Sequence, residues 1–165
     1  MAKRRYTGAT KRVAYGEDDG TEIAFTGSSA TFLDNCYDFS RKFSSDEIDT
    51  TAYGDYPFGT SEPGFIDVSF DVGMRHGVNN DGELDDDLEF LEEHCNSRLP
   101  FRIATLDNGH STTPNGWIFS VIATSADESG DVKSAQDHKY TLKRCTGALP
   151  PKRIVAGVAT EWVPS

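Results

Sequence analysis

The chain has 165 residues, of which 36% are hydrophobic and 26% are charged, with 15 glycines and 7 prolines. This length and composition favour one domain with a modest core, and they exclude collagen-like and wholly disordered chains. The formal net charge of -11 disfavours tight nucleic-acid binding by the body of the protein, because acidic surfaces repel phosphate. No apolar run approaches the roughly 20 residues that cross a bilayer, so we expect no membrane span.

Residues 1–29 are predicted to be an N-terminal arm, because they are rich in glycine, threonine, serine and charge. The first twelve residues hold five bases and no acid, so the rest of the chain carries a formal charge of -16. A short basic segment of this kind can bind nucleic acid or a membrane surface, or it can dock on an acidic neighbour. Within the arm we expect one brief strand at residues 21–25.

The body is predicted to begin near Ala30 with two half-buried strands, both marked by alternation of apolar and polar residues. The first covers residues 36–43. The second has an apolar face made of Val68, Phe70, Val72 and Met74.

Residues 44–66 are predicted to form a connection of 23 residues that holds two prolines, three glycines, five acids and no base. Connections of this length inside a compact domain are usually functional or disordered. Four aromatic residues argue against plain disorder: Tyr53, Tyr56, Phe58 and Phe65. The connection either folds over the edge of its own core or docks onto another copy of the chain, with its rings as interface anchors.

A helix is predicted by the helical spacing of Leu84, Leu88, Leu91 and Cys95, with Asp81 as its cap. The opposite face is strongly acidic: Glu83, Asp85, Asp86, Asp87, Glu89, Glu92 and Glu93. Such a face is either simply solvated or bound to a basic partner from a neighbouring subunit. The basic segment at residues 3–5 is the obvious candidate for that partner.

Three further strands are predicted after the helix, at Phe101–Leu106, at residues 117–123 and at residues 138–146. A turn is expected at residues 107–110 and a polar connection at residues 124–137. Residues 154–162 form either an edge strand or an extended tail. This order of elements predicts a mainly β fold, an antiparallel sandwich or barrel with one flanking α-helix.

Catalytic and metal-binding motifs are weak. The four histidines fall in different predicted elements without metal-ligand spacing, and the three cysteines are too scattered for a disulfide framework. We therefore expect no catalytic residues, no metal and no cofactor. An enzyme would require His110 or His138 to converge with a carboxylate, which nothing in the spacing suggests.

The order of three segments resembles that of the major tail tube proteins of long-tailed bacteriophages, the phage lambda type. The resemblance covers about residues 30–147 and rests on Glu47-Ile48-Asp49-Thr50-Thr51, Pro63-Gly64-Phe65 and Thr141-Leu142-Lys143-Arg144-Cys145-Thr146-Gly147. It implies a tail-tube-like β domain at residues 30–147, between the N-terminal arm at 1–29 and a C-terminal extension at 148–165.

The resemblance implies hexameric rings that stack into a hollow tube with an acidic lumen, through which DNA passes without specific binding. Asp49 would order the start of the long loop. The other implied subunit and ring contacts are Ile48, Tyr53, Tyr56, Phe58, Phe65, Arg4 and Arg5. The implied partners are other copies of the chain and the terminator, tape measure and distal tail proteins. The implied location is the virion tail, assembled in the cytoplasm of the host bacterium.

Two alternatives stay open. The tube of a contractile tail or secretion apparatus shares the implied architecture. A monomeric β-sandwich module is the alternative from another class, with Tyr53, Tyr56 and Phe58 as a stacking platform for a sugar or peptide.

Overall fold

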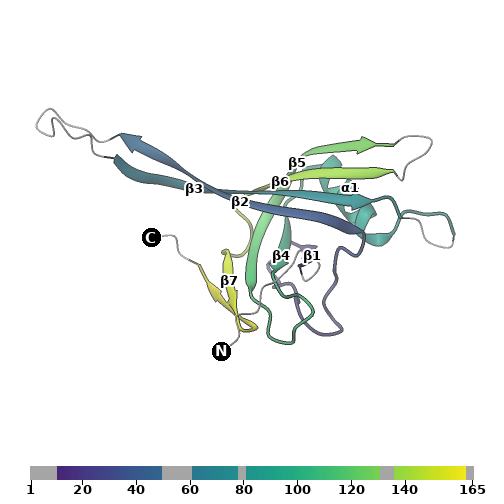
Figure 1. Cartoon of the computed structure of the whole chain (residues 1–165), viewed down its shortest axis with the longest axis horizontal. Coiled ribbons are helices and arrows are strands. Elements are labelled where there is room, and N and C mark those ends of the chain that lie inside the picture. Colours follow the sequence, from purple (N-terminus) through teal and green to yellow (C-terminus); the bar gives the residue numbers. More distant parts are fainter. Residues whose placement is uncertain (1–10, 50–60, 78–80, 131–135, 163–165) are drawn as a thin grey trace, which may run out of the picture.

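The computed structural model describes residues 11–49, 61–77, 81–130 and 136–162, and within them one curled antiparallel sheet packs against one helix (Figure 1). The helix α1 spans Asp86–Ser97. The strands are β1 Arg12–Glu17, β2 Cys36–Asp49, β3 Ser61–Arg75, β4 Phe101–Leu106, β5 Gly116–Ser129, β6 Asp137–Arg144, β7 Lys152–Val155 and β8 Val158–Glu161. The predicted mainly β, antiparallel fold with one flanking helix is confirmed, in the form of a half-barrel.

The main path of the sheet runs in the order β1-β4-β5-β6-β3-β2. β5 pairs with β4 along one edge. Along its other edge it pairs first with β7 over residues 116–118 and then with β6 over residues 121–129. The C-terminal hairpin of β7 and β8 therefore extends the sheet from β5, on the same edge as β6.

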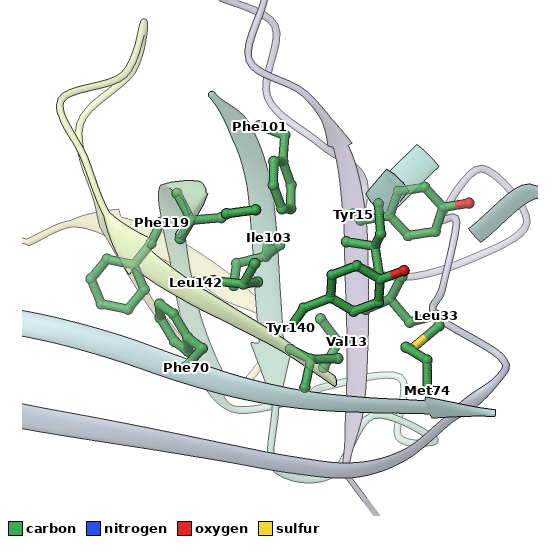
Figure 2. Close-up of a cluster of buried hydrophobic side chains, with 14 of the residues drawn as sticks. Val13, Tyr15, Leu33, Phe70, Met74, Phe101, Ile103, Phe119, Tyr140 and Leu142 are labelled. Carbon is green, nitrogen blue, oxygen red and sulfur yellow. The ribbon is translucent and has the colours of Figure 1, made fainter. Parts of the chain in front are cut away.

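The main core lies on the inner face of the curled sheet. Figure 2 shows side chains from β1, β3, β4, β5 and β6 converging there, among them Val13, Phe70, Ile103, Phe119 and Leu142. Leu88 and Leu91 of α1 are fully buried in the same cluster, so the helix closes this face. Alternate residues of each strand supply the core because successive side chains of a strand point to opposite faces.

A second, smaller core lies on the outer face of β1, β4 and β5. It consists of Ala14, Ala104, Leu106, Ile118 and Ile154. Ile23, Phe25 and Phe32, from the segment between β1 and β2, pack over it. Since β4 is covered on both faces, all six of its residues are buried.

The N-terminal strand lies earlier than predicted. Residues 21–25 are not a strand; β1, at Arg12–Glu17, pairs with β4 instead. The outer edge of β1 is also occupied, because Tyr15 N donates to Thr31 O and Leu33 N donates to Val13 O. The sheet thus begins inside the segment that the sequence assigned to the arm.

Two predicted loops are strand at both of their ends. The connection predicted at residues 44–66 is too long, because β2 continues to Asp49 and β3 begins at Ser61, with a register shift between Ser45 and Glu47. The polar connection predicted at residues 124–137 is also too long, because β5 continues to Ser129 and pairs there with Asp137. Hydrogen bonding between neighbouring strands holds both segments extended despite their polar composition.

The helix begins later than predicted. Its N-cap is Asp85 rather than Asp81, and the Asp85 side chain makes no capping hydrogen bond. That carboxylate instead accepts a hydrogen bond from Asn35 Nδ2 at 2.9 Å. The helix ends at Ser97, and its C-cap, Arg98, adopts a left-handed conformation with φ of 55°.

Candidate assembly surfaces

The distal half of the β2–β3 hairpin is a two-stranded ribbon. β6 pairs with β3 only from Ser69 to Arg75, whereas β2 follows β3 out to the pair Asp49–Ser61. Residues 44–49 and 61–67, here called the ribbon, therefore pair only with each other among the described residues, and Figure 1 shows them projecting from the body. Since an isolated two-stranded hairpin is marginally stable in water, the ribbon has less support from the described chain than the rest of the sheet.

Three of the residues predicted to make subunit contacts lie on this ribbon. Ile48 pairs with Glu62, Asp49 is the last residue of β2, and Phe65 lies in β3. Asp49 therefore ends β2 directly before residues 50–60, which lie outside the described residues, so its role in ordering the loop stays a prediction. The other predicted contact residues, Tyr53, Tyr56, Phe58, Arg4 and Arg5, lie outside the described residues.

An aromatic cluster holds the base of the ribbon. The Phe43 ring, which is 40% exposed, lies 5.4 Å from the Trp117 ring and 6.3 Å from the Trp162 ring. Trp162 follows β8, and its backbone N donates to Pro151 O at 2.8 Å. Residues 154–162, which the sequence left as an edge strand or a tail, thus form most of a hairpin whose last ring packs against the ribbon base.

Arginines surround this cluster. Arg41 lies 5.4 Å from the centre of the Phe43 ring, and Arg153 lies at the same distance from the Trp117 ring. Arg144 lies 5.6 Å from the Trp162 ring. Cations at this distance from aromatic faces add attraction beyond simple area burial. Burial lowers the pKa of the Arg41 guanidinium, which donates to Thr105 Oγ1 at 2.8 Å.

We expect Trp162→Ala to lower the free energy of unfolding by about 2 kcal/mol, since it removes a half-buried ring from the cluster. Hydrogen exchange of the amides near Phe43 should accelerate as well, because Trp162 contacts that ring. Urea unfolding and exchange mass spectrometry measure both effects. Val158→Ala is the control, because Val158 lies on the same hairpin and is 63% exposed. Equal effects of the two substitutions would contradict the role of Trp162.

β2 is the open edge of the sheet. It ends the strand order and has 14 residues, and its outer edge has no strand partner in the described part of the chain. A long unpaired edge offers backbone N–H and C=O groups to another chain, and folded proteins normally cover such edges. The open edge therefore marks a second place where a neighbour can bind.

The outer face of β2, β3 and β6 is polar and carries nearly balanced charge. Its exposed charged residues among the described side chains are three acids and four bases: Asp38, Asp67, Asp71, Lys42, Arg75, Lys139 and Lys143. Neighbouring strands place these residues side by side, and Thr141 Oγ1 donates to Asp71 Oδ1 at 3.2 Å. Elsewhere on the described surface, a dense acidic group lies on and before α1.

Two polar residues of α1 are buried, which sequence reasoning missed. Asp87 accepts hydrogen bonds from the backbone N and the Nδ2 of Asn35, at 3.0 and 2.9 Å. His94 Nε2 lies 3.1 Å from Glu17 Oε2. Asp87 and His94 lie beside Leu88 and Leu91 at helical spacing. This spacing is the sequence signal that could have indicated the burial of both residues.

Arg102 is the largest buried polar group. Its guanidinium is fully buried and binds Glu22 through Nε at 3.0 Å and Nη2 at 3.2 Å. It also donates to Ser120 Oγ, Leu149 O and Pro150 O. Lys152 Nζ adds a 2.7 Å contact to Glu22. This network fastens the segment after β1 and the start of β7 to the outer face of β4 and β5.

The histidines are closer together than their spacing suggested. His76 Nδ1 lies 2.9 Å from His138 Nε2, and the two rings stack. No group of three or more His, Cys, Asp or Glu side chains in the described ranges is arranged to hold a metal. The three cysteines are free and half-buried, and burial raises the pKa of Cys36 to about 11, which keeps its thiol protonated.

The fold is that of tail tube subunits, as comparison with solved structures shows. No protein-family model and no curated protein matches the chain. A chain in the virion of a native gene transfer agent particle matches with a TM-score of 0.62 and 10% identity, over 86% of this chain and 95% of that one. The SPP1 tail tube matches with a TM-score of 0.61 and 13% identity, over 87% and 77%. A chain in the sheath-tube complex of an extracellular contractile injection system matches with a TM-score of 0.59 and 12% identity, over 91% and 93%.

Among the described residues, no helix has the length and apolar character of a membrane span.

Proposed function

We propose that this chain is a structural subunit of a phage-type tail tube, which self-assembles into stacked hexameric rings around a hollow channel. The observation that carries the proposal is the ribbon, which extends the β2–β3 pair beyond the rest of the sheet without a third strand. The open edge of β2 supports it, because neighbouring copies would cover that edge. One matching structure is the tail of an empty gene transfer agent particle with C6 symmetry, which supports six subunits in a ring.

We further propose that the channel is acidic and passes DNA without binding it specifically. Negative charge on the wall keeps a polyanion from sticking, because each bound phosphate slows transit. The net charge of -11 supports this. The polar face of β2, β3 and β6 carries three acids and four bases among its described exposed side chains, so a channel lined by that face would owe its acidity to other residues.

The remaining parts of the proposal concern roles and partners. In this proposal residues 1–29 make contacts between subunits, residues 30–147 form the ring, and residues 148–165 make further contacts between subunits. Two strands within the outer segments, β1 and β7, also pair with strands of the central sheet. The partners are the terminator, tape measure and distal tail proteins, in a virion assembled in the host cytoplasm. Matches to both the SPP1 tube and a contractile injection system leave both tail types as candidates.

Negative-stain electron microscopy and sedimentation of concentrated, pure protein test this function. We expect rings or tubes of uniform diameter. A protein that sediments as a compact monomer at every concentration and ionic strength would refute the proposal. It would favour the alternative, a monomeric module that binds a sugar or peptide through Tyr53, Tyr56 and Phe58.

Replacing Tyr53, Tyr56 and Phe58 together with Ser is expected to abolish polymerisation and leave a folded monomer, because rings that anchor an interface contribute to binding rather than to the core. Sedimentation measures the assembly, and circular dichroism measures the fold. An unfolded triple variant would show that these rings belong to the core of the monomer.

A further inference from the structure

Two histidines are in contact where β3 ends and β6 begins. His76 follows the last residue of β3, and His138 is the second residue of β6. Nδ1 of His76 lies 2.9 Å from Nε2 of His138. His138 is 5% exposed, whereas His76 is exposed. Solvent therefore reaches one ring of the pair directly, and the protein encloses the other.

The two contacting nitrogens face each other. The ring centres are 5.2 Å apart and the ring planes differ by 18°. This separation matches the 2.9 Å between the nitrogens plus the distance from each ring centre to its own nitrogen, so both nitrogens lie on the line between the centres. A zinc ion on that line would need about 4 Å, the length of two Zn–N bonds. The contact is therefore an N–H···N hydrogen bond, in which one ring donates and the other accepts.

The number of protons on the two rings decides whether this bond exists. Each neutral imidazole carries one proton on one of its two nitrogens. When the pair takes up one proton, the donor ring becomes a cation and still donates to the other ring. A second proton can be added only at the accepting nitrogen, because the other three nitrogens are then already protonated. The bond between His76 and His138 thus tolerates one added proton and is lost with two.

Charged and titratable groups lie on each element that borders the pair. Arg75 precedes His76 on β3, and Glu128 of β5 stands opposite His138 in the strand register. The Tyr140 ring lies 6.3 Å from the His138 ring, and burial, followed by nearby acidic groups, raises the pKa of Tyr140. The other groups are Asp137 and Lys139 beside His138, Asp85 before α1, and Asp87, Glu92 and Cys95 of α1. Acids outnumber bases in this set, so they favour one added proton, whereas two cationic rings repel each other at hydrogen-bond distance.

The pair lies at the junction between β3, β6 and the segment that leads to α1. The backbone N of His76 donates to Gln136 O at 2.9 Å. The carbonyl of Gly77 accepts from the backbone N of Asp85, the N-cap of α1, at 3.1 Å. Loss of the ring contact therefore loosens the end of β3 first. The pairing of β3 with β6 from Ser69 to Arg75 does not depend on it.

We propose that His76 and His138 form a pH-sensitive clasp, which holds the end of β3 on β6 at neutral pH and opens when both rings are protonated. Histidine side chains gain their charge between about pH 8 and pH 5. The open state binds more protons than the closed state, so the closed state is favoured at higher pH and is lost as the pH falls. This inference goes beyond the proposed tube function and does not depend on it.

Hydrogen exchange of the His76 amide tests the clasp, because this amide donates to Gln136 O beside the pair. The full chain is studied by NMR at a concentration below that of assembly, and each rate is corrected for the exchange of an unstructured peptide at the same pH. We expect the protection of this amide, relative to that of Ile103 in β4, to fall about tenfold between about pH 7.5 and about pH 5, the effect of one lost hydrogen bond. With ¹⁵N-labelled histidine, a scalar coupling between the two facing nitrogens should be visible at the higher pH and absent at the lower.

His76→Asn is the sharpest variant, because the amide of asparagine stands where Nδ1 stood and can offer either an N–H or an oxygen. It can bind His138 in both protonation states, so protection at position 76 should change less than about twofold between the two pH values. His76→Ala lacks the contact and should show the low protection at both. His110→Asn is the control, since His110 is an exposed histidine of the turn after β4, and this variant should respond to pH as the unmodified chain does.

The clasp is overturned if protection at His76 does not fall in acid, or if it falls equally in His76→Asn. Absence of the coupling between the two ring nitrogens at neutral pH also overturns it, as does a pH response that His110→Asn removes. None of these results bears on tube formation, which electron microscopy tests separately.

Discussion

Arg102→Met is expected to lower the free energy of unfolding by about 3 kcal/mol or more, the largest loss among the single substitutions considered. The substitution removes the guanidinium that binds Glu22, Ser120 and two backbone carbonyls, and methionine satisfies none of them. Breaking a buried ion pair from one side costs more than the pair contributes, because the remaining polar groups stay desolvated. Urea unfolding followed by circular dichroism measures the change.

Lys139→Met is the control for Arg102→Met. Lys139 is exposed on the polar face, so its loss should change the free energy of unfolding by less than about 0.5 kcal/mol. Glu22→Gln should fall between the two, because it weakens the network without removing its hydrogen-bond geometry. An Arg102 variant as stable as the control would show that the network adds nothing beyond packing.

Shortening the ribbon is expected to abolish assembly while leaving the monomer folded. In this variant an Asn-Gly turn joins Ser45 directly to Ile66, which face each other across the hairpin. The main core and the pairing of β3 with β6 lie outside the deleted segment, so we expect the circular dichroism spectrum of the monomer to be retained. Sedimentation and electron microscopy should show no tubes at concentrations where the full chain forms them.

A matched deletion in the β5–β6 hairpin controls for shortening as such. An Asn-Gly turn joins Ser129 to Asp137, which are also cross-strand partners. This variant should still form tubes if the β2–β3 ribbon is the specific docking element. Loss of tubes in both variants, or in neither, would contradict that assignment.

The sequence predicts the position of a strand or helix well where the same pattern of burial holds along the whole element. β4 matches its predicted bounds because Phe101, Ile103, Ala104 and Leu106 are apolar and a proline and a turn bound the strand. The Leu88–Leu91 stripe likewise locates α1. In both cases the pattern along the chain directly reflects burial in the monomer.

The prediction of strands fails where a strand has no buried face in the monomer, or where both of its faces are buried. Residues 44–49 and 124–129 read as loops because they have no apolar face, yet cross-strand hydrogen bonds make them strand. β1 was missed because Val13 and Ala14 are buried on opposite faces, so no alternation is visible.

Side-chain contacts of Asp87 and of the Arg102 network join residues far apart in the sequence. Asn35 and Asp87 are 52 positions apart, and Glu22 and Arg102 are 80 apart. No local spacing encodes such contacts. Charge counts alone pointed to the acidic helix, whereas the burial of Asp87 emerges only from the folded arrangement.

The pairing of β1 with β4 also sets an order of events during synthesis. Tyr15 meets Ile103 in the register of these strands, so the first strand lacks β4 until about two thirds of the polypeptide has left the ribosome, while the backbone of residues 31–33 is available earlier to its outer edge. At typical translation rates that wait lasts roughly 5–20 s, with Val13 and Tyr15 unshielded. Distant pairing of this kind also slows folding. The leading strand therefore completes its place in the sheet only after β2, β3 and α1 have been synthesised.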